Sequence, residues 1–288
     1  MSGLPADFPD ALAGILAFFS FWMGACVASF LNVVIWRVPR GESIVSPPSH
    51  CPSCGGGIRW WQNVPVVSWL VLRGRCASCR SPISPRYIIV EVLGGVLFLA
   101  AFAKFGVFAP VFWVWISLMI AGSFIDFDHQ LLPDFVTVGG MVYGVALSIV
   151  SCFTPFGAGF LSPIYPAWQP FGMPLWNSLS GLALGFGLLW LVRFFGSKAF
   201  GREAMGLGDV FLMGAIGALF GPLAVLVTLI VSSIAGSAVG IALVLAAKAR
   251  LGRFVAIPFG PYLCLGCLIW MFWGPSLVSA YVSLLTGR

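Results

Sequence analysis

The sequence predicts an all-α protein, a polytopic bundle of about eight transmembrane helices with a small cytosolic, zinc-ribbon-like insertion after the first helix. Its composition is the first reason, because the 288 residues are 60% hydrophobic and 8% charged. Soluble domains carry about 25% charged residues, so most of this chain must face lipid or other helices. The second reason is the recurrence of apolar runs near the ~20 residues that a membrane span requires. The third is a single long polar segment, residues 37–87, directly after the first apolar run.

The first apolar run, residues 11–36, is expected to stay in the protein as a transmembrane helix. The ten residues before it carry Asp7 and Asp10 instead of the basic residues of a cleavable signal. An uncharged loop rich in Pro, Gly and aromatic residues, 154–177, is expected between the fourth and fifth helices. The seven later helices are expected near residues 88–105, 108–125, 135–153, 178–195, 210–220, 222–247 and 254–273.

The basic residues indicate how the bundle is oriented. If residues 37–87 are cytosolic, alternation of the spans places every Lys and Arg except Lys104 and Arg288 on the cytosolic side. Multi-pass proteins show this bias. The N-terminus and the 154–177 loop then lie outside. The net charge of +6 would also fit nucleic-acid binding, but its distribution is explained by topology, so no nucleic-acid partner is expected.

Four cysteines in the polar segment have the spacing of a metal site. Two CxxC pairs are separated by residues 55–75, and each pair can offer two thiolates to one tetrahedral zinc ion. Two disulfides are the alternative, which a reducing cytosol disfavours. Four cysteines leave no position for water, so the zinc is expected to be structural. A further close pair, Cys264 and Cys267, falls in an apolar helix and is interpreted as packing. The expected ligands are Cys51, Cys54, Cys76 and Cys79.

Acidic residues at the ends of apolar runs are the candidate catalytic groups. Asp126 closely follows the third span, and Asp209 ends the sequence Gly-Leu-Gly-Asp as the sixth span begins. Ionisable groups at membrane level are costly and usually functional. In the topology above both lie on the cytosolic side, so they can approach each other. Two adjacent carboxylates share one proton, and the ionised member can activate water while the protonated member polarises a peptide carbonyl.

Other interpretations of these carboxylates remain open. Asp126, Asp128 and Asp209 also fit the proton relay of a transporter, although no internal repeat typical of such folds is visible. Asp134 fits a helix cap for the span that begins at residue 135. A scaffold protein that uses only its zinc segment for docking is a third alternative. It would tolerate loss of the aspartates but not loss of the cysteines.

Taken together, these motifs resemble the type IV prepilin peptidases, also called leader peptidase/N-methyltransferases, which are GxGD aspartic proteases of the bacterial cytoplasmic (inner) membrane. The resemblance implies that Asp126 and Asp209 match the catalytic pair and that the four cysteines match the zinc-binding tetrad. It implies removal of the leader from prepilins or pseudopilins and N-methylation of the new N-terminus with S-adenosylmethionine. The matching stretches are residues 24–39, 49–54, 58–69, 73–79, 82–91, 125–134 and 206–209.

The resemblance also implies a division of labour along the chain. Residues 1–36 form the first transmembrane helix, 37–87 the four-cysteine segment associated with methyl transfer, and 88–288 the peptidase bundle. No Rossmann fingerprint is present, so S-adenosylmethionine is expected to bind the cytosolic segment and nearby helix ends. The loop at 154–177 is longer than the family pattern suggests, which bears on partner contacts. The candidate cofactor-binding residues are Glu42, Asn63, Arg86 and Glu91.

Overall fold

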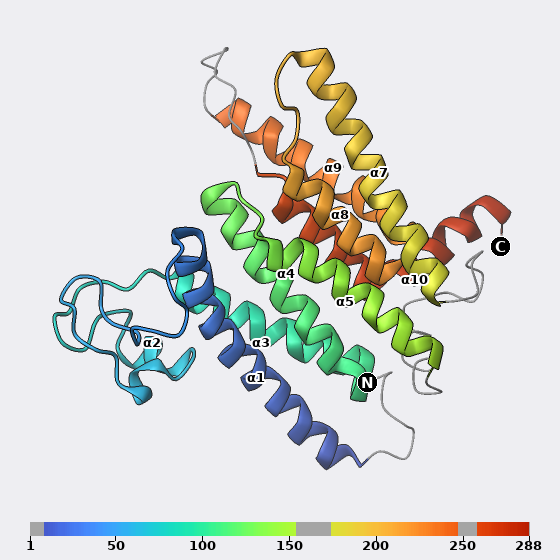
Figure 1. Cartoon of the computed structure of the whole chain (residues 1–288). Helices are drawn as coiled ribbons and strands as arrows, with labels where there is room; N and C mark the ends of the chain where they lie inside the picture. The colour runs from blue at the N-terminus through green and yellow to red at the C-terminus, as the bar shows by residue number, and fades with distance from the viewer. Residues whose placement is uncertain (1–8, 154–173, 247–257, 288) are drawn as a thin grey trace. The chain divides into compact units, whose positions relative to one another are not determined.

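The computed structural model describes residues 9–153, 174–246 and 258–287 (Figure 1). In these residues the regular structure is helical, apart from two isolated β-bridges, His50 with Gly57 and Arg75 with Pro82. The predicted all-α class is therefore confirmed. The chain divides into two compact units, residues 1–121 and 122–288.

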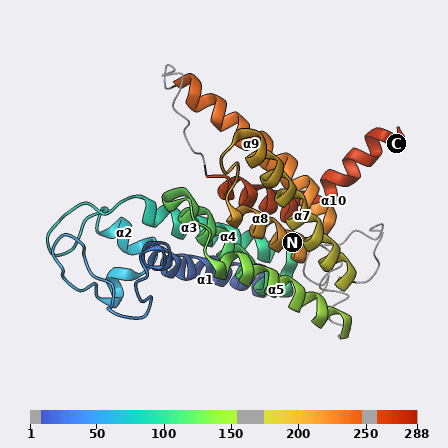
Figure 2. The ribbon, with the colours of Figure 1, turned by 45° about the horizontal axis from the view of Figure 1, so that its top comes forward.

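The first unit is built on the packing of α1 (Asp10–Arg37) against α3 (Arg86–Phe105). Small residues line this contact, since Gly24 on α1 meets Gly94 on α3 and Ala28 packs beside them. Small side chains let membrane helices approach closely. The segment between the two helices extends beyond their ends and carries the short helices η1 (Val38–Arg40), η2 (Trp60–Asn63) and α2 (Val67–Val71) (Figure 2). After α3, η3 (Gly106–Phe108) leads into α4 (Ala109–His129), which runs through the boundary between the units.

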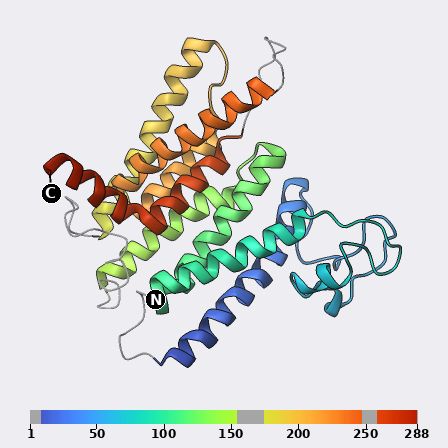
Figure 3. The ribbon, with the colours of Figure 1, turned by 180° about the vertical axis from the view of Figure 1, so that it is seen from behind.

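The second unit surrounds one short, buried helix, α8 (Leu207–Phe220), in which every residue from 209 to 220 except Phe211 is buried. A helix that is apolar on every side belongs in a core, which explains why this run is too short for an ordinary span. α8 contacts α5 (Asp134–Phe153), α7 (Pro174–Phe200), α9 (Pro222–Ala246) and α10 (Gly260–Thr286) (Figure 3).

The helices have the length and the apolar composition predicted for membrane spans. Six helical segments of the described chain are long and apolar enough to cross a membrane. One of them, Arg86–His129, is 44 residues long and contains both α3 and α4, so it can cross twice at ~20 residues a span. With α8, the eight predicted helices are all present in the described residues.

Several predicted helix boundaries differ from those of the structure. α4 continues to His129 instead of ending near residue 125, because the chain turns only at Gln130, whose φ is +52°. α10 continues through Pro275 to Thr286, since a proline inside a membrane helix does not have to end it. α7 begins at Pro174, so the last four residues of the predicted 154–177 loop are helical; the rest of that loop lies outside the described residues.

Candidate functional site

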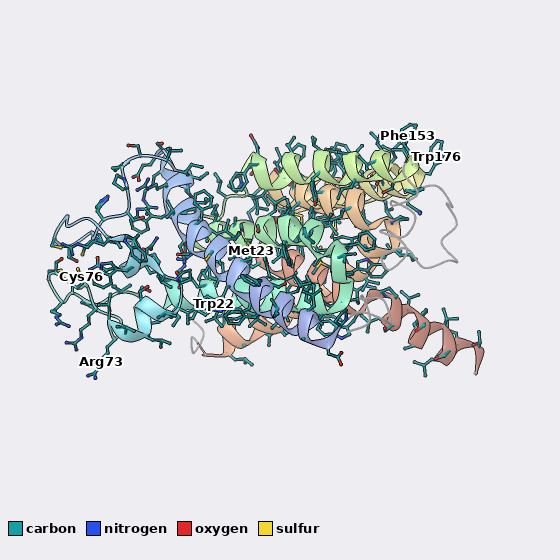
Figure 4. The ribbon with its side chains drawn as sticks, turned by 90° about the horizontal axis from the view of Figure 1, so that it is seen from below. Trp22, Met23, Arg73, Cys76, Phe153 and Trp176 are labelled. Atoms are coloured by element: carbon teal, nitrogen blue, oxygen red, sulfur yellow. The ribbon has the colours of Figure 1, made fainter. Side chains whose placement is uncertain are left out.

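The four cysteines of the polar segment converge on one point. The sulfur atoms of Cys51, Cys54, Cys76 and Cys79 all lie within 4.8 Å of one another. Figure 4 shows Cys76 and Arg73 in this segment, away from Trp22 and Met23 on α1. The sequence prediction that these four residues share a site is thus matched by the structure.

Two similar turns present the thiols. In the first, the amide of Cys51 donates to Gly56 O and the amide of Gly55 donates to Cys51 O; in the second, the amides of Cys76 and Arg80 make the same two bonds with Ser81 O and Cys76 O. The residue after each CxxC has a positive φ, +68° at Gly55 and +62° at Arg80. Amides of the first turn also face a thiol: hydrogen bonds from the backbone of Cys54 and Ser53 and from the Ser81 side chain lower the pKa of Cys51 to about 6.

The donor set fits a zinc ion better than disulfides. All four thiols are free, and Cys51 Sγ lies 3.9 Å from Cys79 Sγ. A disulfide requires ~2.05 Å between the sulfurs. Four thiolates at ~2.3 Å around a tetrahedral ion lie roughly 3.8 Å apart, close to the separation observed. The disulfide alternative does not fit this geometry.

The candidate cofactor residues are not all in one place. Asn63 lines a cavity of about 360 Å³ in the first unit, whereas Glu91 is buried on α3 and accepts the Val66 amide at 2.7 Å. Glu42 is exposed in the turn after η1, and Arg86 begins α3. The cavity walls include Ser29, Phe30, Val33, Arg37, Ile44 and Ser49.

The two candidate catalytic aspartates are brought together in the second unit. Asp126 lies in the last turn of α4 and Asp209 in the first turn of α8, and only 6% and 8% of their surfaces are exposed. They are close enough for their charges to interact. Asp126 Oδ2 accepts a hydrogen bond of 3.0 Å from the amide of Gly260, the first residue of α10. Asp209 Oδ2 lies beside Gly206, and its Oδ1 is buried without a hydrogen-bond partner among the described residues.

Leu132 explains why glycine is required before Asp209. A Cβ on Gly208 would lie 2.8 Å from Leu132 Cβ, which is closer than real side chains approach. The same Leu132 side chain would lie 3.3 Å from a Cβ on Gly260. The leucine of the loop after α4 therefore occupies the space between the starts of α8 and α10. Leu132, six residues after Asp126, therefore packs against the glycine that directly precedes Asp209.

The loop that leads into α8 is tied to α7. Arg193 donates to the carbonyl oxygen of Met205 and, at 2.8 Å, to the carboxylate of Glu203. The amide of Ala204 donates to Ser197 Oγ at 3.1 Å. Glu203 is largely exposed, so its ion pair contributes little, but the bond to the Met205 carbonyl fixes the backbone directly before Gly206.

The other acidic residues near Asp126 are placed differently. Asp128 is exposed, because two positions along a helix turn it roughly 200° away from Asp126. Asp134 is the first residue of α5 itself, one position inside the helix it was expected to cap. A relay that includes Asp128 is therefore less well supported than a pair of Asp126 and Asp209.

Several neighbours of this pair were missed by sequence reasoning. Gly260 and Cys264 come from α10, far along the chain, and the buried Cys264 thiol is close enough to interact with both aspartates and with Ser123. Arg193 was noted only as a topological charge. Gly260 stands directly before Pro261, where a helix start is favoured, but nothing in the sequence relates that start to Asp126.

Comparison with known proteins adds an independent line of support. Residues 22–105 match the family model of the Bacterial Peptidase A24 N-terminal domain, and residues 113–241 match the Type IV leader peptidase family. The two matches cover both candidate sites. No solved structure matches the chain.

Relatives with curated names cover most of the chain. The "Prepilin leader peptidase/N-methyltransferase" of Myxococcus xanthus (strain DK1622) is 40% identical over 84% of this chain and 67% of the relative. Proteins of the same name are 34% identical in Xanthomonas campestris, over 90% of this chain and 92% of the relative, and in Legionella pneumophila, over 98% of each.

Proposed function

Since this chain belongs to the type IV leader peptidase family, we propose that Asp126 and Asp209 are the catalytic pair with which it cleaves prepilins. It is a prepilin leader peptidase with N-methyltransferase activity, as its relatives' names state. The observation that carries the assignment is the burial of these two carboxylates, within range of each other's charge, at the end of α4 and the start of α8. Peptide hydrolysis by two adjacent carboxylates needs this arrangement.

The mechanism follows from the chemistry of such a pair. One aspartate, ionised, takes a proton from water while the water oxygen bonds to the scissile carbonyl carbon. The other, protonated, donates its proton to the carbonyl oxygen. When the tetrahedral intermediate collapses, the C–N bond breaks, the leaving amine receives the first proton, and the second aspartate recovers its own. One water is consumed, and both carboxyl groups return to their starting states.

The enzyme is a multi-pass inner-membrane protein, and we place its active site at the cytosolic face. The basic residues, apart from Lys104 and Arg288, fall on one side when the spans alternate. α4 ends and α8 begins on that same side, and these two helix ends carry Asp126 and Asp209. The N-terminus then lies outside, and residues 37–87, which carry the four cysteines, lie in the cytosol. The family resemblance implies that leaders are cut on that face, so prepilins and pseudopilins are proposed as substrates.

A structural zinc ion is proposed for Cys51, Cys54, Cys76 and Cys79. The distances between their sulfur atoms fit four-coordinate zinc, and a closed set of four thiolates leaves no position for a reacting water. Its contribution is to fold the segment between α1 and α3.

We place S-adenosylmethionine in the 360 Å³ cavity of the first unit. Its volume lies in the range of small-molecule sites, and it combines apolar walls, such as Phe30 and Val33, with the Asn63 amide and the hydroxyls of Ser29 and Ser49. When bound, the cofactor supplies an electrophilic methyl group to the new N-terminal amine. Arg37 shapes the cavity, since it donates to the carbonyls of Ser43 and Pro47 at 2.8 and 2.7 Å.

Replacing Asn63 with Ala is expected to weaken S-adenosylmethionine binding by up to about tenfold, as loss of one hydrogen bond costs about 0.5–1.5 kcal/mol. Calorimetric titration of the detergent-solubilised protein measures this without any turnover. Arg75→Ala, a change at an exposed residue of the same segment that does not line the cavity, is the control and should bind as the wild type does. Equal affinity of the Asn63 variant and the wild type would remove this cavity as the cofactor site.

The glycines before Asp209 give a second expected outcome. Gly208→Ala should slow leader cleavage at least about tenfold, because its Cβ meets Leu132 and displaces the start of α8. Adding Leu132→Ala should restore part of the rate by removing the obstructing side chain. Gly187→Ala, on α7 with open space around its Cβ, should cleave normally. The steric account fails if Gly208→Ala cleaves at the wild-type rate.

The function itself is tested with the full chain reconstituted in liposomes, a purified prepilin, and mass spectrometry of the products. Leader loss is expected with or without S-adenosylmethionine, and a further ~14 Da on the mature product only when the cofactor is added. Folded, zinc-loaded protein that leaves prepilin intact would overturn the proposal.

A further inference from the structure

We infer that the backbone amide of Gly260 positions Asp126 as the ionised, water-activating member of the pair, which leaves Asp209 to carry the proton. This inference rests on the proposed peptidase function and assigns the two roles within it. It also adds Gly260 as a positioning residue, on a helix that neither aspartate belongs to.

The first observation is the hydrogen bond itself. Gly260 N lies 3.0 Å from Asp126 Oδ2, and both residues are buried. A backbone N–H can only donate, so it stabilises a carboxylate oxygen that holds no proton. Gly260 is also the first residue of α10, where the amides lack partners within the helix and the helix dipole is positive. Both effects favour negative charge on Asp126. Asp209 also lies at a helix start, that of α8, so the two residues are distinguished by their hydrogen bonds and not by the dipole alone.

The second observation is the space around this contact. A Cβ on Gly260 would lie 2.6 Å from Asp126 Oδ2 and 3.1 Å from Asp126 Cγ, with Leu132 Cδ1 at 3.3 Å. Any side chain at this position would therefore push the carboxylate away from the amide. Glycine is required here for close approach, because the first turn of α10 must come within hydrogen-bond distance of the carboxylate.

The third observation is the different surroundings of Asp209. The backbone of Gly206 faces its carboxyl group at Oδ2, as Gly260 faces Asp126, but its buried Oδ1 has no hydrogen-bond partner in the described chain. A buried carboxylate oxygen without a partner is costly, but a protonated oxygen there becomes a donor for the substrate carbonyl. Oδ1 of Asp209 is thus the atom that delivers the proton to the scissile carbonyl oxygen.

The other ionisable groups near Asp126 do not alter this assignment. Cys264 of α10 is buried beside both aspartates and is a thiol, which adds no charge when protonated. Asp128 and His129 share the last turn of α4 with Asp126 but are exposed to solvent, and so is Asp134 at the start of α5. Asp209 of α8 is the group whose charge Asp126 meets in the buried part of the site.

The test is Gly260→Ala in the full-length, reconstituted enzyme. Leader cleavage should lose about 10²-fold or more in kcat, with KM changed little, because the carboxylate is misplaced while the substrate contacts remain. The acidic limb of the kcat/KM profile should move to higher pH, since the ionised form of Asp126 loses its donor. Gly236→Ala is the matched control, because its Cβ makes only ordinary contacts, the nearest at 3.6 Å to Tyr262.

N-methylation of an already cleaved pilin reports on folding in the same sample, and it should be retained in both variants. If Asp126→Asn is inactive but Gly260→Ala keeps the wild-type kcat and pH profile, this inference is wrong and the proposed function stands. If Asp126→Asn still cleaves, the proposed function itself fails.

A second measurement does not depend on how well Gly260→Ala folds. Isotope-edited infrared spectra of protein labelled at the aspartate carboxyl carbons should show a protonated carboxyl group at neutral pH in the wild type and in Asp128→Asn. That band should be absent from Asp209→Asn. Its persistence in Asp209→Asn would place the proton elsewhere and overturn the assignment.

Discussion

Replacing either Asp126 or Asp209 with Asn is expected to lower kcat/KM for leader cleavage by at least about 10³-fold, which is a typical loss when a member of a catalytic unit is removed. Asparagine has nearly the same size as aspartate, so the bundle should remain folded around the buried site. It can neither take a proton from water nor deliver one to the carbonyl. Purified prepilin and each reconstituted variant, followed by gel analysis of the products over time, measure the effect.

The matched control for this prediction is Asp128→Asn. Asp128 lies on the same last turn of α4 but is exposed, so the variant should cleave within about twofold of the wild type. The two inactive variants should still methylate a mature pilin, because the cysteine segment and its cavity belong to residues 1–121. Cleavage by either Asn variant would contradict the paired mechanism. It would favour the alternative in which these carboxylates form the proton relay of a transporter.

Replacing any one of Cys51, Cys54, Cys76 and Cys79 with Ser is expected to release zinc and unfold the segment between α1 and α3. Zinc binding to closed cysteine sites contributes about 10–16 kcal/mol to folding in zinc-finger peptides, which is more than a segment of this size can replace. Methyl transfer should fall to background, because the segment supplies the part of the proposed cofactor cavity that is not on α1, including Ser49 and Asn63. Cleavage should be reduced far less, because both aspartates lie in the other unit.

Metal analysis and hydrogen exchange of residues 49–82 are the direct measurements for this second prediction. Cys152→Ser changes an exposed cysteine on α5 and should leave zinc content, exchange and both activities unchanged. A Cys54→Ser protein that is zinc-free and fully active in methyl transfer would contradict the assignment of a structural zinc site to these four cysteines. The scaffold alternative differs in its outcome, since it expects the protein to tolerate loss of both aspartates but not loss of the cysteines.

Much of this fold could be predicted because its signals are local. Apolar length predicts a span wherever the bilayer is the solvent, and CxxC spacing predicts a shared metal because each short turn presents two thiols together. The glycines and aspartate of residues 206–209 likewise indicate a close approach of backbone before any coordinates are known. The four cysteines and the proximity of Asp126 and Asp209 follow from such patterns.

What could not be predicted depends on contacts between distant parts of the chain. The end of α4 was missed because two aspartates look like a helix end, yet both remain helical inside the last turn. Gly260 is separated from Asp126 by most of the second unit, and only the packing of α10 brings its amide to the carboxylate. The position of Leu132 between Gly208 and Gly260 is likewise a matter of tertiary packing.

The most direct test of the central claim is the affinity for a prepilin peptide in which a tetrahedral hydroxyl-bearing group replaces the scissile bond. A transition-state analogue binds 10²-fold or more tightly than the ground state, so roughly this advantage over a flat, uncleavable amide analogue is expected in the wild-type enzyme. The advantage should disappear in Asp126→Asn and in Asp209→Asn and persist in Asp128→Asn. Equal binding of both analogues to the wild-type enzyme would contradict a catalytic pair at these residues.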